Sequence, residues 1–276
     1  MTDVDPSLWR SLLFVPGARP DRFSKAAASG ADAVCIDLED AVPPQDKESA
    51  RAATLSFLMG FTDRSVPLGL RVNAVGTPEG EADLAALRDA PGLDFVMMPK
   101  PMGLEDIDRV RSAYGHDRVV VVIETARALG IVEAIADHSA VIAGIYGAID
   151  LAGEIGCDLS WEAHLYGRSR CVAAFGAARK TFFDVPYLDV KDADGLTDAT
   201  KKAKTLGIHA RAAIHPSQLA VIHQALAPSA EDITQAQRVV EAFEAAEGAV
   251  ALLDGQMIEL PVIKAARRVL AHTRRG

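Results

Sequence analysis

The segment VVVVIETARALG, Val119 to Gly130, joins a short run of β-branched residues to an acid and then to a helical pattern. Four valines and an isoleucine in succession, without polar alternation, are typical of a strand that is buried on both faces. The run ends at Glu124, and a helix-like segment begins directly after Thr125. A buried strand that ends in a carboxylate indicates a site at the carboxyl end of that strand.

The same pattern of strand followed by helix recurs along the chain. We predict eight strands, at Ser11–Pro16, Ala33–Asp37, Leu68–Asn73, Phe95–Pro99, Val119–Glu124, Val141–Tyr146, Thr181–Pro186 and Arg211–His215. Helical segments between them are predicted at Pro20–Ser29, Ser49–Met59, Gly80–Asp89, Leu104–Ala113, Ala126–Asp137 and Asp198–Thr205. Such alternation is typical of α/β proteins with a parallel sheet, and eight units favour a (β/α)8 TIM barrel. An open doubly wound sheet is the main rival, but no GxGxxG motif follows the first strand.

The end of the chain is not needed to close eight strands. It contains a predicted helix at Ala230–Glu247, a turn element ALLDGQMIELP, and a last predicted helix at Val262–Thr273. We therefore predict a barrel domain over residues 1–220. Residues 221–276 are predicted to form a C-terminal helical extension that serves as a lid or an oligomer contact.

Composition narrows the classes of partner and the cellular location. A formal net charge of −9 argues against nucleic-acid or anionic-membrane partners, which favour basic surfaces. No apolar run approaches the roughly 20 residues of a membrane span, and the first residues lack a signal-peptide pattern. The three cysteines show no CxxC spacing, so neither a disulfide framework nor a zinc site is indicated. We expect a cytoplasmic protein with small-molecule partners.

Charged and polar side chains fall repeatedly at the predicted strand ends. Because the loops after barrel strands form the mouth, these side chains are expected to converge there. The set comprises Asp37, Glu39, Asp40, Arg71, Asn73, Lys100, Glu124, Asp150 and His215.

Glu124 and Asp150 lie 26 residues apart, which is one strand–helix unit, so we expect them in neighbouring loops. Two adjacent carboxylates repel each other unless a cation neutralises them or one is protonated. Oxygen ligands from few side chains fit a hard divalent cation, above all Mg²⁺. The alternatives are an acid favoured by a helix dipole for Glu124 and a helix cap for Asp150.

Arg71, at the end of an apolar strand, is suited to the carboxylate of a substrate. Its alternative is a salt bridge to Glu39 or Asp40, which is compatible with substrate binding. Arg10 precedes the first strand. It is a further substrate-binding candidate if its side chain points across the same mouth, and its alternative is a solvated charge at the start of the strand.

Two further candidates lie beside the first and last strands. Arg19, Arg22 and Lys25 form a local cationic patch that is suited to phosphate, although basic residues on a helix face are often simply solvated. His215 is either a proton carrier or a structural histidine, and the structural reading is favoured.

Seven segments together resemble the citrate lyase beta-subunit family, in the group that contains malyl-CoA and citramalyl-CoA lyases (the HpcH/HpaI aldolase superfamily). The resemblance runs in order over nearly the whole chain. The segments are RSLLFVPGARPDRFSKA, GADAVCIDLEDAVPP, LRVNAVGTP, VVVIETARAL, YGAIDLAGEIG, AAIHPSQ and GQMIELPVIKAARRVL. The resemblance implies an Mg²⁺-dependent TIM barrel that cleaves or forms a carbon–carbon bond beside an acyl-CoA thioester, and a homotrimer or hexamer.

Site residues follow from the resemblance position by position. The metal carboxylates match Glu124 and Asp150, and the arginine that grips a 2-oxo acid matches Arg71. The resemblance also implies that Asp37, Glu39 and Asp40 are acids that support the site, and that Arg19, Lys25, His215 and Pro216 lie near the CoA group. Two positions depart from the family pattern. Ile149 stands where an acid often precedes the metal aspartate, and Glu259 stands where relatives carry a proton-transferring aspartate from a neighbouring subunit.

The implied reaction converts a 3-hydroxy-3-carboxyacyl-CoA into a 2-oxo acid and acetyl-CoA. Arg71 and the cation held by Glu124 and Asp150 would bind its hydroxyl and carboxylate, and Glu259, or a water near Asp40, would protonate the thioester enolate. The alternatives are a class II aldolase acting on free pyruvate, an acyl-CoA thioesterase, and a subunit of an acyl-carrier-protein-dependent citrate lyase complex.

Overall fold

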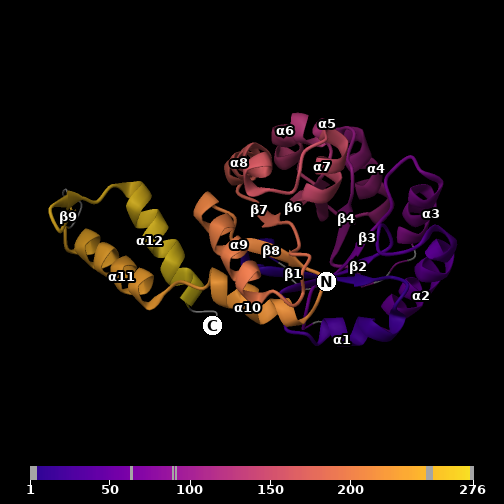
Figure 1. Ribbon diagram of the computed structural model, residues 1–276, viewed down its shortest axis with the longest axis horizontal. Coiled ribbons are helices and arrows are strands. Elements are labelled where there is room, and N and C mark those ends of the chain that lie inside the picture. Colours follow the sequence, from indigo (N-terminus) through magenta and orange to yellow (C-terminus); the bar gives the residue numbers. More distant parts are fainter. Residues whose placement is uncertain (1–4, 63–64, 89, 91, 247–250, 274–276) are drawn as a thin grey trace. The chain divides into compact units, whose positions relative to one another are not determined.

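The computed structural model describes residues 5–62, 65–88, 90, 92–246 and 251–273. Its chain divides into two compact units, Met1–Ala225 and Leu226–Gly276. Figure 1 colours the chain along its length and labels the elements of each unit. Within the described residues, no helix combines the length and the apolar composition that crossing a membrane requires.

In the described part of the first unit, eight parallel strands close into a barrel in the order β1 to β8 (Figure 1). Each strand pairs in parallel with the next, and β8 pairs with β1. The predicted TIM barrel is therefore confirmed. The strands are β1 Ser11–Pro16, β2 Ala33–Asp37, β3 Leu68–Arg71, β4 Phe95–Met98, β5 Val119–Ile123, β6 Val141–Tyr146, β7 Thr181–Asp184 and β8 Ala210–Ala213.

Five strands end one or two residues earlier than predicted, at β3, β4, β5, β7 and β8. The excluded positions include Pro99 and Pro186, which have no N–H to donate to a ladder. The others include Asn73, Glu124 and His215, whose side chains belong to the loops rather than to the sheet. The early strand ends release these residues into the βα loops, where barrel sites are built.

Large apolar side chains fill the amino-terminal half of the barrel interior. The Trp9 ring centroid lies 5.2 Å from that of Phe95 and 6.3 Å from that of Phe183. Gly69 is required beside them, because a Cβ at this position would lie 2.1 Å from the Phe95 ring. This end of the barrel is therefore a packed core, which leaves the carboxyl end of the strands for chemistry.

Helices alternate with the strands and cover the barrel (Figure 1). Three of them, α7, α8 and α10, were not among the predicted helices, and the predicted helix at Ala126–Asp137 is divided in two at Ile131. The helices of this unit are α1 Phe23–Ala27, α2 Lys47–Gly60, α3 Pro78–Leu87, α4 Leu104–Tyr114, α5 Ala126–Gly130, α6 Val132–Asp137, α7 Ala148–Ile155, α8 Trp161–Ala177, α9 Ala193–Leu206 and α10 Ser217–Leu226, with short 3₁₀ turns η1 Pro6–Leu8, η2 Pro20–Arg22 and η3 Pro44–Asp46.

The second unit is a helical hairpin that carries a two-stranded ribbon. It contains α11 Ala230–Ala245, β9 Leu252–Leu253, β10 Gln256–Met257 and α12 Leu260–Thr273. Ser229 begins α11 with a capping box to Asp232, and an apolar cluster that includes Val239 and Ile263 packs the two helices together. The predicted end of the first helix, Glu247, lies outside the described residues.

Candidate active site

The carboxyl ends of β2 to β6 bring a cluster of acids to the mouth of the barrel. Asp37 and Arg71 are the last residues of β2 and β3, and Glu124 directly follows β5. Asp150 lies on the first turn of α7, after β6. A cavity of about 540 Å³ opens between these elements, and Asp40 lines it together with the other four. Of the strand-end residues predicted to converge, these five do so, and Glu39 and Lys100 contact them, whereas Asn73 and His215 do not line the cavity.

Arg71 is held by three carboxylates. Its Nε and Nη2 donate to the two oxygens of Asp37 at 2.7 and 2.6 Å. Its Nη1 lies 2.9 Å from Glu39 Oε2 and 3.7 Å from Asp40 Oδ2. The guanidinium also covers the ring of Phe14, 5.0 Å from the ring centroid. The predicted salt bridges are thus present, and Asp37 provides the bidentate one, so Arg71 is already oriented when an anion arrives.

Lys100 places a second cation among the same acids. Its Nζ lies 2.9 Å from Glu39 Oε1, 3.7 Å from Asp150 Oδ2 and 4.0 Å from Asp40 Oδ1. Burial alone would lower the pKa of Lys100, but Glu39, Glu124 and Asp40 together raise it above its usual value. The ammonium group is therefore charged and partly neutralises the cluster.

Glu124 is almost completely enclosed, with 2% of its surface exposed, as is Asp37. Its Oε1 accepts a hydrogen bond from the backbone N–H of Lys100 at 3.1 Å, and Lys100 has a positive φ of 48°. Gly147 leaves room for it, because a Cβ there would lie 2.3 Å from Glu124 Cβ. Burial, with the charges of Glu39 and Asp150, raises the pKa of Glu124 to about 9.

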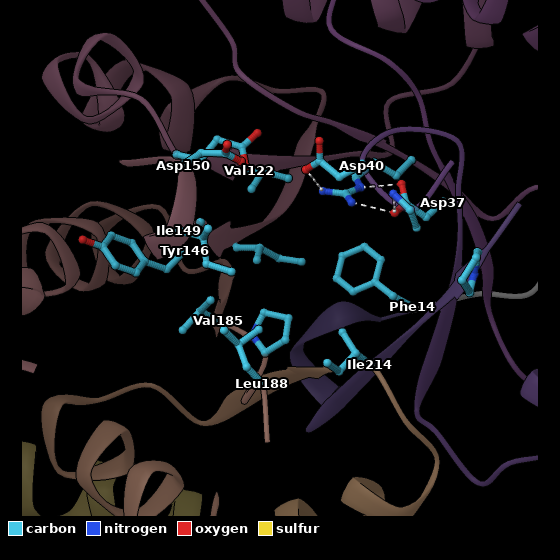
Figure 2. A pocket seen from close by; sticks show the side chains of 17 residues that line it. Phe14, Asp37, Asp40, Val122, Tyr146, Ile149, Asp150, Val185, Leu188 and Ile214 are labelled. Carbon is cyan, nitrogen blue, oxygen red and sulfur yellow. Dashed lines mark hydrogen bonds and ion pairs between the residues drawn. The ribbon is translucent and has the colours of Figure 1, made fainter. Parts of the chain in front are cut away.

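The rest of the cavity is apolar. Figure 2 shows Asp37, Asp40 and Asp150 on one side of the cavity, and Val185, Leu188 and Ile214 on the opposite side. Ile149, which directly precedes Asp150, also lines it. A ligand in this cavity would therefore be bound by charge at one end and by apolar contact along the remainder.

The acids suit a hard divalent cation. The carboxyl groups of Asp37, Glu39, Asp40, Glu124 and Asp150 face two cations, Arg71 and Lys100, so the cluster has a formal charge of −3 when all five acids are ionised. A divalent ion between Glu124 and Asp150 would remove the repulsion that raises the Glu124 pKa. No group of three or more His, Cys, Asp or Glu side chains with metal-site geometry occurs in the described residues, so such an ion would rely on substrate and water oxygens for its other ligands.

One residue that supports the site escaped the sequence reasoning. Lys47, at the start of α2, donates from Nζ to the carbonyl oxygens of Leu38 and Glu39 at 2.7 Å each and to Asn73 Oδ1 at 2.6 Å. Asn73 is thus occupied in joining two loops and does not line the cavity. A lysine on a helix carries no signal in the sequence that distinguishes this role from solvation.

Arg10 does not reach the mouth. It precedes β1, and its Nε lies 3.1 Å from Oδ2 of Asp32, which precedes β2. Because all barrel strands are parallel, residues before the strands lie at the end opposite to the mouth. The expectation that Arg10 points across the mouth to bind substrate is therefore wrong.

The residues predicted near CoA lie in loops after β1 and β8, which are neighbours in the barrel. Arg19 is exposed and binds Asp21 through two hydrogen bonds of 2.9 and 2.8 Å, and Lys25 is exposed on α1. His215 Nδ1 lies 2.7 Å from Ser217 Oγ at the start of α10, and Pro216 follows it. Their role toward CoA stays a prediction.

Glu259 belongs to the second unit, where it is exposed between β10 and α12. Its carbonyl oxygen accepts hydrogen bonds from the backbone N–H groups of Val262 and Ile263 at 2.9 and 3.2 Å. The backbone of Glu259 thus begins α12, and its exposed carboxylate is available to a partner.

Family models match most of the chain. The model described as HpcH/HpaI aldolase/citrate lyase matches residues 10–216. A second model, described as a carbon–carbon bond lyase of the TIM-barrel fold, matches residues 160–274. The two matches together include both the barrel and the C-terminal unit.

Individual relatives extend over almost the full length. The chain is 33% identical to (3S)-malyl-CoA thioesterase of Cereibacter sphaeroides, over 95% of this chain and 94% of that protein. It is 31% identical to L-malyl-CoA/beta-methylmalyl-CoA lyase of the same organism, over 95% and 93%. The crystal structure of CitE from Mycobacterium tuberculosis with magnesium, acetoacetate and coenzyme A is similar with a TM-score of 0.84 and 30% identity, over 97% of this chain and 98% of that one.

Proposed function

The chain belongs to the HpcH/HpaI aldolase/citrate lyase family and is a carbon–carbon lyase, and we propose that its substrate is a 3-hydroxy-3-carboxyacyl-CoA thioester of the malyl-CoA or citramalyl-CoA kind. The observation that carries the proposal is the joint position of Arg71, Glu124 and Asp150 on one cavity. An arginine beside two acids that need a cation is suited to bind a 2-hydroxy carboxylate.

Magnesium is the cation that we propose. The similar CitE structure contains magnesium and coenzyme A, and the two acids of this chain supply the oxygen ligands that Mg²⁺ prefers. When bound, the ion would supply Lewis-acid stabilisation of negative charge on the hydroxyl oxygen. Glu124 and Asp150 would hold it, and the charge of Lys100 would then be shared among Glu39 and Asp40.

The residues of the chain would direct the bond cleavage. The hydroxyl group loses its proton, and the oxygen becomes the carbonyl of the 2-oxo acid as the carbon–carbon bond breaks. The bonding electrons remain on the thioester side as an enolate, which takes up a proton to give acetyl-CoA. Arg71 would bind the carboxylate throughout, and Asp40, which lines the cavity and is half-exposed, would receive the hydroxyl proton through a water molecule.

The proton for the enolate has two candidate sources. One is a water near Asp40, and the other is Glu259 of a neighbouring copy in a homotrimer or hexamer. Glutamate has one methylene more than the aspartate usual in relatives, which changes its reach. We further propose that the C-terminal unit acts as a lid or an oligomer contact, with residues 1–220 as the catalytic barrel, and that the enzyme works in the cytoplasm.

A substrate panel tests the proposed function. Malyl-CoA, methylmalyl-CoA and citramalyl-CoA should each be incubated with the full chain, with and without Mg²⁺, while the 2-oxo acid is measured with a hydrazine reagent. We expect release of a 2-oxo acid and acetyl-CoA from at least one thioester, and loss of this activity in EDTA. Cleavage of free 4-hydroxy-2-oxo acids without any action on thioesters would instead indicate a class II aldolase.

Thioester hydrolysis is the second candidate function, because the thioesterase of Cereibacter sphaeroides is 33% identical over nearly the full length. Hydrolysis would release free CoA thiol and leave the carbon–carbon bond intact. A thiol reagent in the same panel separates the two outcomes. Activity of the isolated chain on free CoA esters would also exclude dependence on an acyl-carrier-protein complex.

The raised pKa of Glu124 predicts that Mg²⁺ binds more tightly as the pH rises. Without the ion, the folded chain holds a proton on Glu124 between pH 4.5 and about 9 that the unfolded chain lacks, so its stability falls as pH rises through this window. The cation must displace this proton, so its apparent affinity should increase about tenfold per pH unit between pH 6 and 8. Calorimetric titration, or the Mg²⁺-induced shift in Tm, measures the effect. An affinity that is independent of pH in this range would contradict it.

A further inference from the structure

The cavity contains its charges on one side only. Among the described residues that line it, Arg71 is the single cation, and its three nitrogens already face Asp37 and Glu39. The nearby ammonium of Lys100 is occupied by Glu39, Asp40 and Asp150. A ligand carboxylate bound beside Arg71 therefore occupies the one cationic side chain among the described lining residues.

The opposite side presents apolar side chains that folding leaves exposed. Leu188 and Ile214, in the loops after β7 and β8, are 56% and 41% exposed. Ile149, in the first turn of α7 directly before Asp150, is 49% exposed and also lines the cavity. Large aliphatic side chains gathered on a cavity wall indicate an apolar ligand surface. Figure 2 places Leu188 and Ile214 across the cavity from Asp40 and Asp150.

Because one side of the cavity is charged and the other is apolar, a substrate of the proposed kind can bind in one orientation. The carbon that carries the hydroxyl group has four substituents: the hydroxyl group, the carboxylate, the CH₂ that leads to the thioester, and one variable group. The first two must lie at the acids and Arg71. The variable group and the CH₂ therefore point away from the charges, into the apolar part of the cavity.

We propose that this chain selects thioesters whose variable group is a small alkyl group, and that Ile149, Leu188 and Ile214 determine this specificity. A carboxymethyl group, which would make the acyl unit citryl, would bring a second negative charge into a site that still has a formal charge of −1 after a divalent ion binds. No cation among the described lining residues is free to pair with it. This inference rests on the proposed function.

Four CoA thioesters that differ only in the variable group test the inference, with hydrogen, methyl, ethyl or carboxymethyl at this position. We expect kcat/KM with the methyl or ethyl compound to exceed that with the carboxymethyl compound at least ~100-fold, because the second carboxylate is left unpaired. The methyl compound should exceed the hydrogen compound about tenfold. Equal cleavage of the carboxymethyl compound would overturn the inference and leave the lyase function intact. No cleavage of any of the four, with Mg²⁺ present, would overturn both.

A charge placed on the apolar side should alter this preference. Leu188→Arg supplies a partner for a second carboxylate, so the ratio of kcat/KM for carboxymethyl to methyl should rise at least about tenfold. Leu188→Met keeps the apolar surface and should keep the wild-type preference. Met59→Arg, on exposed α2, makes the same change of charge outside the cavity and should leave the ratio unchanged. If Leu188→Arg does not fold, Ile214→Lys serves instead, and an unchanged ratio in the folded variant would overturn the assignment.

Discussion

Replacing Glu124 by glutamine should lower Mg²⁺-dependent kcat/KM by about three orders of magnitude and leave the fold intact. The amide keeps an oxygen that can accept the hydrogen bond from Lys100 N–H, so the loop after β4 retains its anchor. It lacks the negative charge that holds the cation beside Asp150, and several kcal/mol of charge stabilisation in the transition state are lost with it. Steady-state kinetics on the preferred thioester, with Mg²⁺ titrated, measures the effect.

Because the pKa of Glu124 is raised, this substitution should change metal binding without changing the charge of the metal-free protein near neutral pH. Near neutral pH the metal-free carboxyl group is already protonated, and glutamine resembles it in charge and size. The Tm of Glu124→Gln in EDTA should therefore match that of the wild type, and the increase in Tm on addition of Mg²⁺ should disappear. Glu48→Gln, on the exposed face of α2, is the matched control and should behave as the wild type. Full activity of Glu124→Gln with the metal still bound would refute the assignment of Glu124 as a ligand.

The barrel and its acids were accessible from the sequence for a simple reason. A strand that is covered on both faces must be apolar throughout, so runs such as Val119–Ile123 stand out, and the first polar residue after each run lies at the mouth. Glu124 and Asp150 followed from this rule alone. Lys100 was recognised only as a strand-end charge, because its contacts with Glu39, Asp40 and Asp150 join loops that are far apart in the sequence.

The omissions also have physical causes. Helix α8 buries His164 and Arg168 on its inner face, beside Cys171 and Phe175, so its apolar residues do not follow a helical period. Arg168 is stabilised there by Asp184, 2.8 Å away. A pattern based on apolar residues does not detect a helix whose buried face includes a histidine and an arginine.

The wrong prediction for Arg10, in contrast, could have been avoided from strand direction alone. Residues before parallel strands and residues after them lie at opposite ends of the barrel, and Arg10 lies before β1. Its bond to Asp32 joins the amino ends of β1 and β2. Strand direction alone therefore separates Arg10 from Arg71, although both are arginines next to apolar strands.

Replacing Arg71 by methionine should have the largest effect on stability. The guanidinium is the shared partner of Asp37 and Glu39, both of which are buried. Its removal leaves the enclosed carboxylate of Asp37 without its cation and Glu39 with Lys100 alone, and breaking such a buried pair costs about 3–5 kcal/mol of the free energy of unfolding. Urea titration of the metal-free protein measures the loss. Activity per folded molecule should also fall about 100-fold or more, because the substrate carboxylate loses its charged partner.

Two further variants separate stability from catalysis. Arg71→Met combined with Asp37→Asn removes one stranded charge and keeps one oxygen that can accept from the N–H of Glu39, at the loss of the acceptor for the N–H of Ala41. Stability should therefore recover in part while activity stays low. Arg51→Met breaks a comparable buried pair with Asp83, at 2.6 Å, outside the cavity. It should cost a similar free energy of unfolding and retain kcat/KM per folded molecule. If Arg71→Met kept its activity as Arg51→Met does, Arg71 would serve only to hold Asp37 and Glu39, and the substrate carboxylate would have to bind elsewhere.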